Sequence, residues 1–185
     1  VVYTSFLGAA PDATFTLARD HWATEEHLRA SGMAFTFLRD SFYLDFLPDL
    51  VGEDGVIRGP AGDGRVAAVT RADIARSAVA VLTDPRVNAG RTWDLTGPEA
   101  LTLDEVATIL AERSGRPVRY HDESVEEAYA SRRRWSAPQW QYDAWVSTYT
   151  AIAAGELALV TDHVARLTGR EPTGLASYLS TKEHG

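Results

Sequence analysis

Cysteine is absent from this sequence of 185 residues, and so is an excess of basic charge. Without cysteine the chain cannot form a disulfide scaffold, a cysteine zinc site, an iron–sulfur cluster or a thiol nucleophile. The 26 acidic side chains outnumber 18 basic ones, which argues against a dedicated nucleic-acid binder. The short basic run Arg132-Arg133-Arg134 is expected to be a solvated helix face. No metal is expected, because the histidines and acidic residues lack the spacing of metal ligands.

Long apolar runs are also missing. The longest uncharged candidate, residues 144–155, is too short to cross a bilayer and is interrupted by serine and threonine. No basic segment precedes an apolar stretch in the manner of a secretory signal. We therefore expect a cytoplasmic protein without a membrane partner.

Apolar strands and helices alternate in what remains. Residues 1–7 are rich in β-branched and aromatic side chains and are apolar on both faces, as in a strand of a buried parallel sheet. A helix is expected to begin at an N-cap on Thr14 or Thr16 and to end near residue 31. Residues 34–38 form a second apolar strand, so the N-terminal segment predicts a parallel strand–helix–strand unit.

The later elements are shorter. Strands are predicted at 56–57, 66–69, 91–96 and 118–120, and helices at 70–84, 102–114, 164–167 and 175–179. Thr102 and Glu105 form a capping-box pattern at the start of one of these helices. From residue 124 onward the chain is predicted to be mostly helical, and residues 42–50 to be a short helix or a loop.

The glycine-rich phosphate turn that follows the first strand of a dinucleotide-binding fold is missing. Residues 59–64 contain three glycines, but they also contain Pro60 and precede a strand, which is more typical of a hairpin loop. Few strands are long enough to be buried in a parallel sheet. The simplest prediction is the second half of a longer α/β protein. An independently folded fragment, or a chain whose missing strands come from a partner, is the alternative.

Several short blocks stand in a characteristic order, at residues 2–5, 20–25, 31–39, 62–65, 70–75, 93–97 and 101–105. Together they resemble the NmrA-like branch of the atypical short-chain dehydrogenase/reductase family, and within it the bacterial NAD(P)H:quinone oxidoreductases. The resemblance implies the C-terminal part of a Rossmann-like doubly wound parallel sheet, with a smaller, mostly helical substrate lobe. Residues 1–50 would belong to the Rossmann-like NAD(P)-binding domain, whose first half is absent. Residues 51–185 would form the substrate lobe, interleaved with the remaining sheet elements.

The resemblance also implies a nicotinamide site at the carboxyl ends of the first two strands. The expected cofactor contacts are Thr4, Ser5, Phe6, His21, Arg39, Asp40, Ser41 and Phe42. The expected contacts of a flat acceptor are Tyr43, Trp135 and Trp140, because aromatic rings stack on planar molecules. A hydrophobic cap or a dimer surface is the alternative for the tryptophans.

The family's catalytic Tyr and Lys, four residues apart, align with Leu17 and His21 in this sequence. No phenol is therefore available at position 17, and His21 becomes the expected catalytic residue, as a hydrogen-bond donor to the ribose or to a substrate oxygen. His21 shares a helix face with Leu17, Thr24 and Leu28, and we expect this face to point toward the sheet. A partly buried structural histidine is the alternative.

The function that the resemblance implies is NAD(P)H-dependent hydride transfer to a quinone or a similar flat acceptor, with NADP favoured over NAD. The partners would be a small-molecule acceptor and a second copy in a homodimer. A non-enzymatic NAD(P)-sensing regulator of the NmrA type is the alternative, which Leu17 favours. A shortened chain without activity is a third possibility. By itself, this chain is expected to be inactive and to bind NADPH weakly or not at all.

Overall fold

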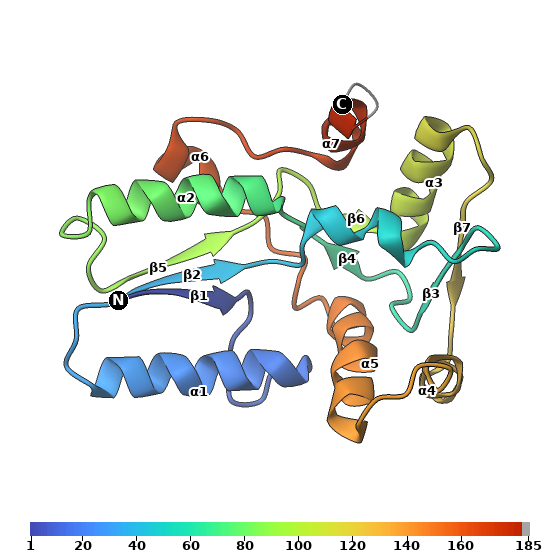
Figure 1. The fold of residues 1–185 in the computed structure, drawn as a ribbon, viewed down its shortest axis with the longest axis horizontal. Coiled ribbons are helices and arrows are strands. Elements are labelled where there is room, and N and C mark those ends of the chain that lie inside the picture. Colours follow the sequence, from blue (N-terminus) through green and yellow to red (C-terminus); the bar gives the residue numbers. More distant parts are fainter. Residues whose placement is uncertain (183–185) are drawn as a thin grey trace.

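The computed structural model describes residues 1–182 and contains a three-stranded parallel sheet in the order β1-β2-β5. The strands are β1 (Val2–Phe6), β2 (Thr36–Asp40) and β5 (Arg91–Leu95). Helix α1 (Thr16–Ala30) covers one face of the sheet, while α2 (Arg71–Thr83) and α6 (His163–Thr168) cover the other (Figure 1). The predicted parallel strand–helix–strand unit and the α/β fold class are thereby confirmed.

A second group of elements forms a lobe beside this sheet (Figure 1). It contains η1 (Leu44–Phe46), η2 (Pro48–Leu50), β3 (Val56–Gly59), β4 (Arg65–Val66), β6 (Leu101–Thr102), α3 (Leu103–Ser114), β7 (Arg119–Asp122), α4 (Val125–Arg132), α5 (Gln139–Ala153) and α7 (Leu175–Lys182). Strand β3 pairs in parallel with β7, and β4 pairs antiparallel with β6. Residues 59–64 therefore connect two different sheets, and the predicted hairpin at this loop is wrong.

The start of α1 is held by side chains that are distant in sequence. Its N-cap is Phe15, whose side chain makes no capping hydrogen bond, so the predicted caps Thr14 and Thr16 are wrong. Instead, the Thr16 backbone N–H donates to Ser147 Oγ at 3.2 Å, and the Thr14 N–H donates to the Glu156 carboxylate at 3.0 Å. These contacts satisfy N–H groups that have no partner within the helix. Local sequence could not reveal them, because both acceptors lie in or just beyond α5.

The start of α3 follows its local sequence. Thr102 Oγ1 accepts a hydrogen bond from the Glu105 N–H at 3.1 Å, and the Glu105 carboxylate accepts one from the Thr102 N–H at 2.9 Å. The helix ends at Gly115, which adopts a left-handed conformation with φ of 65°. The predicted capping box is therefore confirmed, and so is the helix that it begins.

Three apolar clusters join the layers. The largest fills the lobe, and a second packs the sheet against α2 and α6 through residues such as Leu38, Val81 and Val164. A third contains Phe15, Ala18 and Ala144 and joins α1 to α5. The contact between α1 and α5 fixes the lobe next to the carboxyl ends of β1 and β2, where the site was predicted.

Candidate functional site

The carboxyl ends of β1 and β2 meet at one edge of the sheet. Ser5 lies opposite Arg39 and Phe6 lies opposite Asp40 in the parallel register. Beyond the strands, the Leu7 N–H donates to the Asp40 carbonyl at 2.9 Å, which continues the pairing. Open α/β sheets bind ligands at this edge, so the structure brings the predicted strand-end residues to a suitable place.

A buried carboxylate, Glu25 of α1, lies on the face of the sheet that α1 covers and contacts both strand ends. It is 0% exposed and accepts a 2.6 Å hydrogen bond from Ser5 Oγ. Arg39 donates to it twice, at 2.8 and 2.6 Å, and Arg29 donates at 3.0 Å. Burial alone would raise the pKa of Glu25, but the hydrogen bonds from Arg39 and Ser5 outweigh it and leave the pKa below its ordinary value. Glu25 is therefore a carboxylate that ties both strands to the helix.

Two of the predicted cofactor residues are thus already engaged within the protein. The polar groups of Ser5 and Arg39 are directed at Glu25, whereas Thr4 is exposed to solvent. Glu25 was not among the residues predicted from the sequence. Its position four residues after His21, on the same side of an amphipathic helix, was the available signal.

The buried face of α1 is displaced by one residue from the predicted one. Ala18 and Glu25 are the buried residues of this helix, whereas Leu17, His21, Thr24 and Leu28 are each half-buried. The predicted face of Leu17, His21, Thr24 and Leu28 therefore flanks the buried one, and His21 from this face contacts β1. Neighbouring helix positions differ by about 100° in direction, so an error of one position in the predicted face leaves its members at the border of the buried face.

His21 contacts β1 nonetheless. The Tyr3 hydroxyl lies 2.8 Å from His21 Nδ1, and the Phe6 ring stacks on the imidazole with centroids 6.3 Å apart. Burial lowers the pKa of His21, and the nearby carboxylates of Asp20 and Glu25 oppose this effect without reversing it. His21 is therefore a neutral imidazole at pH 7. Tyr3 was not predicted as a residue of the candidate site either, because its position inside a buried strand suggested only packing.

Asp40 and Ser41 are buried with few partners for their side chains. They are 1% and 0% exposed, and within residues 1–182 no hydrogen bond of ordinary geometry reaches Asp40 Oδ1, Asp40 Oδ2 or Ser41 Oγ, although the Tyr43 hydroxyl lies close to the Asp40 carboxyl. Burial raises the pKa of Asp40 to about 8, although the nearby Tyr43 hydroxyl favours the carboxylate. Asp40 is thus a neutral acid at pH 7. Unpartnered buried polar atoms cost about 1–3 kcal/mol each, so native proteins rarely leave them without a role.

The side chains of the next two residues, Phe42 and Tyr43, lie in different places. Burial of the Tyr43 phenol raises its pKa, and the charge of the nearby Asp40 and a hydrogen bond to it raise this pKa further. Phe42 packs against the lobe core, with its ring 6.4 Å from that of Phe46. Tyr43 therefore belongs to the edge of the sheet, whereas the Phe42 side chain faces the lobe.

The two predicted acceptor tryptophans lie in the lobe. The ring of Trp135 is 5.9 Å from that of Trp145, and the Arg134 guanidinium lies 4.0 Å above it. Trp140 is 62% exposed. A cavity of about 510 Å³ between α4 and α5 is lined by Glu126, Tyr129, Ala130, Arg133, Gln139 and Tyr142. This cavity is lined by residues of the lobe and not by residues of the sheet edge.

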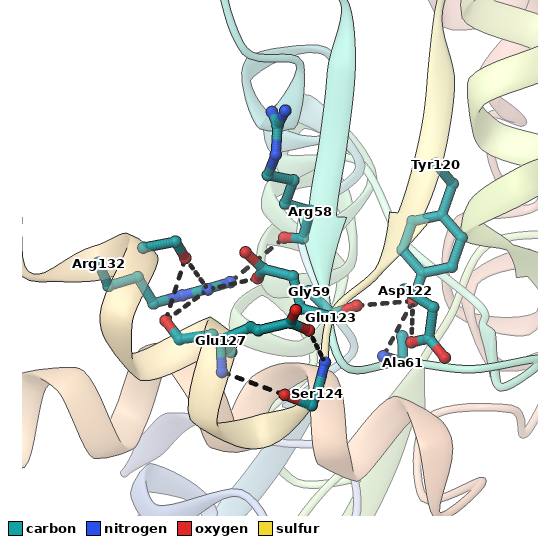
Figure 2. Close-up of polar contacts among 11 residues, drawn as sticks. Arg58, Gly59, Ala61, Tyr120, Asp122, Glu123, Ser124, Glu127 and Arg132 are labelled. Atoms are coloured by element: carbon teal, nitrogen blue, oxygen red, sulfur yellow. Dashed lines mark hydrogen bonds and ion pairs between the residues drawn. The ribbon is translucent and has the colours of Figure 1, made fainter.

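Helix α4 is anchored by a buried ion pair (Figure 2). Arg132 Nη1 donates to Glu123 Oε2 at 2.9 Å, and both side chains are less than a tenth exposed, at 8% and 4%. Arg132 Nη2 also donates to the carbonyl of Arg58 at 3.2 Å. The prediction that the whole basic run is a solvated face is therefore wrong at Arg132, although Arg133 and Arg134 are exposed.

The described part of the chain contains no group of three or more His, Asp or Glu side chains placed to hold a metal ion. Within the same residues, 1–182, no helix combines the length and the apolar character that crossing a membrane requires.

No family model matches the chain. It is 33% identical over 180 residues to an NAD(P)H azoreductase of Xenophilus azovorans and 32% identical over 183 residues to quinone oxidoreductase 2 of Escherichia coli. The crystal structure of this NADPH-dependent E. coli enzyme matches with a TM-score of 0.88 and 32% identity, over 99% of our chain and 67% of its own. The NmrA transcriptional regulator matches with a TM-score of 0.69 at 17% identity, which shows a shared fold alone. An NmrA-like family oxidoreductase of Aspergillus flavus is 28% identical over 180 residues. The chain belongs to the family of the NADPH-dependent quinone oxidoreductase.

This membership confirms the resemblance seen in the sequence. The match covers 96% and 97% of this chain for the two enzyme relatives, and the chain spans 63% of the length of each. The E. coli quinone oxidoreductase has also been solved in complex with NADPH, and that structure matches with the same TM-score of 0.88.

Proposed function

We propose that this chain forms the nicotinamide and acceptor side of an NAD(P)H-dependent oxidoreductase that reduces a quinone or a similarly flat acceptor. The observation that carries the proposal is the structural match over 99% of the chain with an NADPH-dependent quinone oxidoreductase. The azoreductase relative supports a planar acceptor, because an azo group joined to aromatic rings is flat.

The sheet edge fits one part of the cofactor. Asp40 and Ser41, at the carboxyl end of β2, remain proposed contacts of a polar ligand group such as the nicotinamide carboxamide; their side chains are 1% and 0% exposed, so such a group would have to displace the residues that cover them. Thr4, near the carboxyl end of β1, is exposed at the same edge of the sheet. No glycine-rich turn joins a strand to a helix within residues 1–182, so these residues do not fit the diphosphate. NADPH is favoured over NADH because the quinone oxidoreductase relative was solved with NADPH.

NADPH, when bound, supplies the hydride. The residues of this chain bind the nicotinamide and the acceptor and orient them toward each other. Glu25 fixes the ends of β1 and β2 through Ser5 and Arg39, so the edge is rigid before a ligand arrives. Asp40 holds a proton on its carboxyl at pH 7 and can donate a hydrogen bond. His21 is the proposed catalytic residue, as a neutral imidazole that donates to a ligand oxygen.

The acceptor would lie against Tyr43, which is near Asp40 at the sheet edge. Trp135 and Trp140 remain proposed acceptor contacts from the lobe side. The division into a Rossmann-like part at 1–50 and a substrate lobe at 51–185 belongs to the same proposal, as do a homodimer and a cytoplasmic location.

The test is NADPH oxidation by the full-length protein, followed at 340 nm with and without a benzoquinone. We expect quinone-dependent turnover that falls in a His21→Ala variant. Binding of NADPH without turnover would instead support the regulator, which the loss of the phenol at Leu17 favours. Absence of both binding and turnover would overturn both functions.

The 185-residue chain is tested separately by calorimetry. We expect it to bind NADPH weakly or not at all, because its described residues offer no glycine-rich diphosphate site. Micromolar binding by this chain alone would contradict that expectation.

A further inference from the structure

A phenol and an imidazole are paired beside the sheet edge. The Tyr3 hydroxyl of β1 lies 2.8 Å from Nδ1 of His21 on α1. This is the one hydrogen bond of the His21 ring within residues 1–182, so Nε2 has no hydrogen-bond partner there. Tyr3 itself is held by packing, since its ring meets Phe37 edge-on with centroids 6.3 Å apart. The pair is therefore anchored on the Tyr3 side and open on the Nε2 side.

The surroundings favour one protonation state of the imidazole. Phe6 stacks on the His21 ring, and the ring is partly buried, which lowers the pKa of His21. The charged groups that act on it are the carboxylates of Asp20 and Glu25. The Glu25 carboxylate is already bonded to Ser5, Arg29 and Arg39, so it is not available to hold an imidazolium.

A neutral imidazole carries one proton, on one of its two nitrogens. A phenol is a better hydrogen-bond donor than acceptor, and the unprotonated nitrogen of an imidazole is a strong acceptor. When the Tyr3 hydroxyl donates to Nδ1, the ring proton must therefore lie on Nε2. Nε2 is the nitrogen without a partner, so its N–H remains available to a ligand.

We propose that Tyr3 is a positioning residue that holds His21 as the Nε2–H tautomer, so that His21 offers an N–H donor to an oxygen of a bound ligand. The ligand oxygen is a hydroxyl of the dinucleotide or the carbonyl of the acceptor. This inference rests on the proposed function. The phenol that acts on His21 is therefore Tyr3 of β1. The helix position at which the family has its catalytic Tyr is Leu17 in this chain and carries no phenol.

The direct test is nitrogen NMR of the imidazole rings in the full-length protein, labelled with ¹⁵N-histidine. The His21 signals are assigned by their loss in His21→Gln. In the wild type at pH 8 we expect an Nδ1 signal of the unprotonated type and an Nε2 signal of the protonated type. In Tyr3→Phe we expect the two signals to move toward a mixture of tautomers, because the ring remains and the hydroxyl is lost. Protonated Nδ1 in the wild type, or an unchanged ring in Tyr3→Phe, would overturn the proposal.

Tyr129→Phe is the matched control. Its hydroxyl donates to Asp143 in the lobe at 2.8 Å, so its loss removes a phenol hydrogen bond away from His21. We expect the His21 signals to be unchanged in this variant. A shift as large as that in Tyr3→Phe would show a general effect of losing a phenol and would overturn the assignment to Tyr3.

Two additions identify the source of the oxygen. A downfield shift of the Nε2 proton with NADP⁺ alone assigns it to the dinucleotide, and a shift that needs a quinone assigns it to the acceptor. In turnover, Tyr3→Phe should raise the KM of the same ligand about 3- to 10-fold, the range expected for one hydrogen bond. If neither ligand moves the Nε2 signal, the proposal fails. The tautomer of His21 is measured on the protein without ligand and needs no turnover. An inactive protein would therefore overturn the proposed function, while the NMR spectra would still test whether Tyr3 sets the tautomer of His21.

Discussion

Arg39 of β2 donates two hydrogen bonds to Glu25 of α1, from Nε to Oε1 at 2.8 Å and from Nη2 to Oε2 at 2.6 Å. The Ser5 hydroxyl adds a bond from β1 to the same carboxylate. Two neighbouring strands and one helix are thus fixed to a single buried charge. Such a contact stabilises the local geometry as long as every partner is present, because a buried charge without its partners is costly.

Replacing Glu25 by Gln should destabilise the protein by about 2–4 kcal/mol, because the substitution removes the charge that two guanidinium groups share. The measurement is urea unfolding at pH 7. Glu26→Gln is the matched control: its side chain is 49% exposed and pairs with Arg29 alone, so its loss should cost at most about 1 kcal/mol. Equal losses in the two variants would contradict a special role for Glu25.

The lowered pKa of Glu25 should make the protein less stable in acid. The pKa of Glu25 in the folded protein lies below its ordinary value of 4.5, so the unfolded chain takes up the proton first as the pH falls. The stabilising contribution is therefore complete above about pH 5 and is lost as the pH falls through the folded pKa. The difference in unfolding free energy between the wild type and Glu25→Gln should shrink from pH 7 to pH 3. A difference that is constant with pH would show that the carboxylate is not preferentially stabilised in the folded state.

The strands of the site could be predicted because their residues are apolar on both faces and end in polar turns. This pattern placed Ser5, Arg39 and Asp40 at the edge correctly. Glu25 and Tyr3 could not be assigned in the same way. Each reaches the site from the interior of its own element, and the one-residue error in the buried face of α1 hid the carboxylate.

The lobe was less predictable. Strands β3 and β7 pair although some sixty residues separate them, as the register of Val56 with Arg119 shows. Short strands carry too little pattern to specify such a distant partner, so residues 59–64 were taken for a hairpin. Arg132 likewise resembled its exposed neighbours in sequence, and only the fold brings it to Glu123.

Arg132→Met should cost about 3–5 kcal/mol, because it leaves the Glu123 carboxylate buried without its partner. The double variant Arg132→Met/Glu123→Leu should recover part of this loss, since no buried charge then remains unpaired. Urea unfolding measures all three proteins. Arg133→Met, on the exposed neighbour, should change stability by less than about 0.5 kcal/mol. A double variant no more stable than Arg132→Met would show that lost packing, rather than the unpaired charge, causes the damage.

The raised pKa of Asp40 should make the free energy of unfolding depend on pH in the opposite direction from Glu25. Burial raises its pKa in the folded protein to about 8, whereas in the unfolded chain the carboxyl has its ordinary value of 3.8. Between these values the folded protein binds a proton that the unfolded chain has released, so stability falls as the pH rises. The slope from this group is about 1.4 kcal/mol per pH unit.

Asp40→Asn keeps the shape of the side chain and cannot ionise, so it should gain stability over the wild type by about 2 kcal/mol more at pH 8 than at pH 6. Asp45→Asn is the control. Hydrogen bonds from Arg71 outweigh burial and lower the pKa of Asp45, so this group stays ionised across the same range. Its effect on stability should be equal at the two pH values. If the advantage of Asp40→Asn were also constant, Asp40 would be a carboxylate at neutral pH, and it could not donate the hydrogen bond that we assign to it.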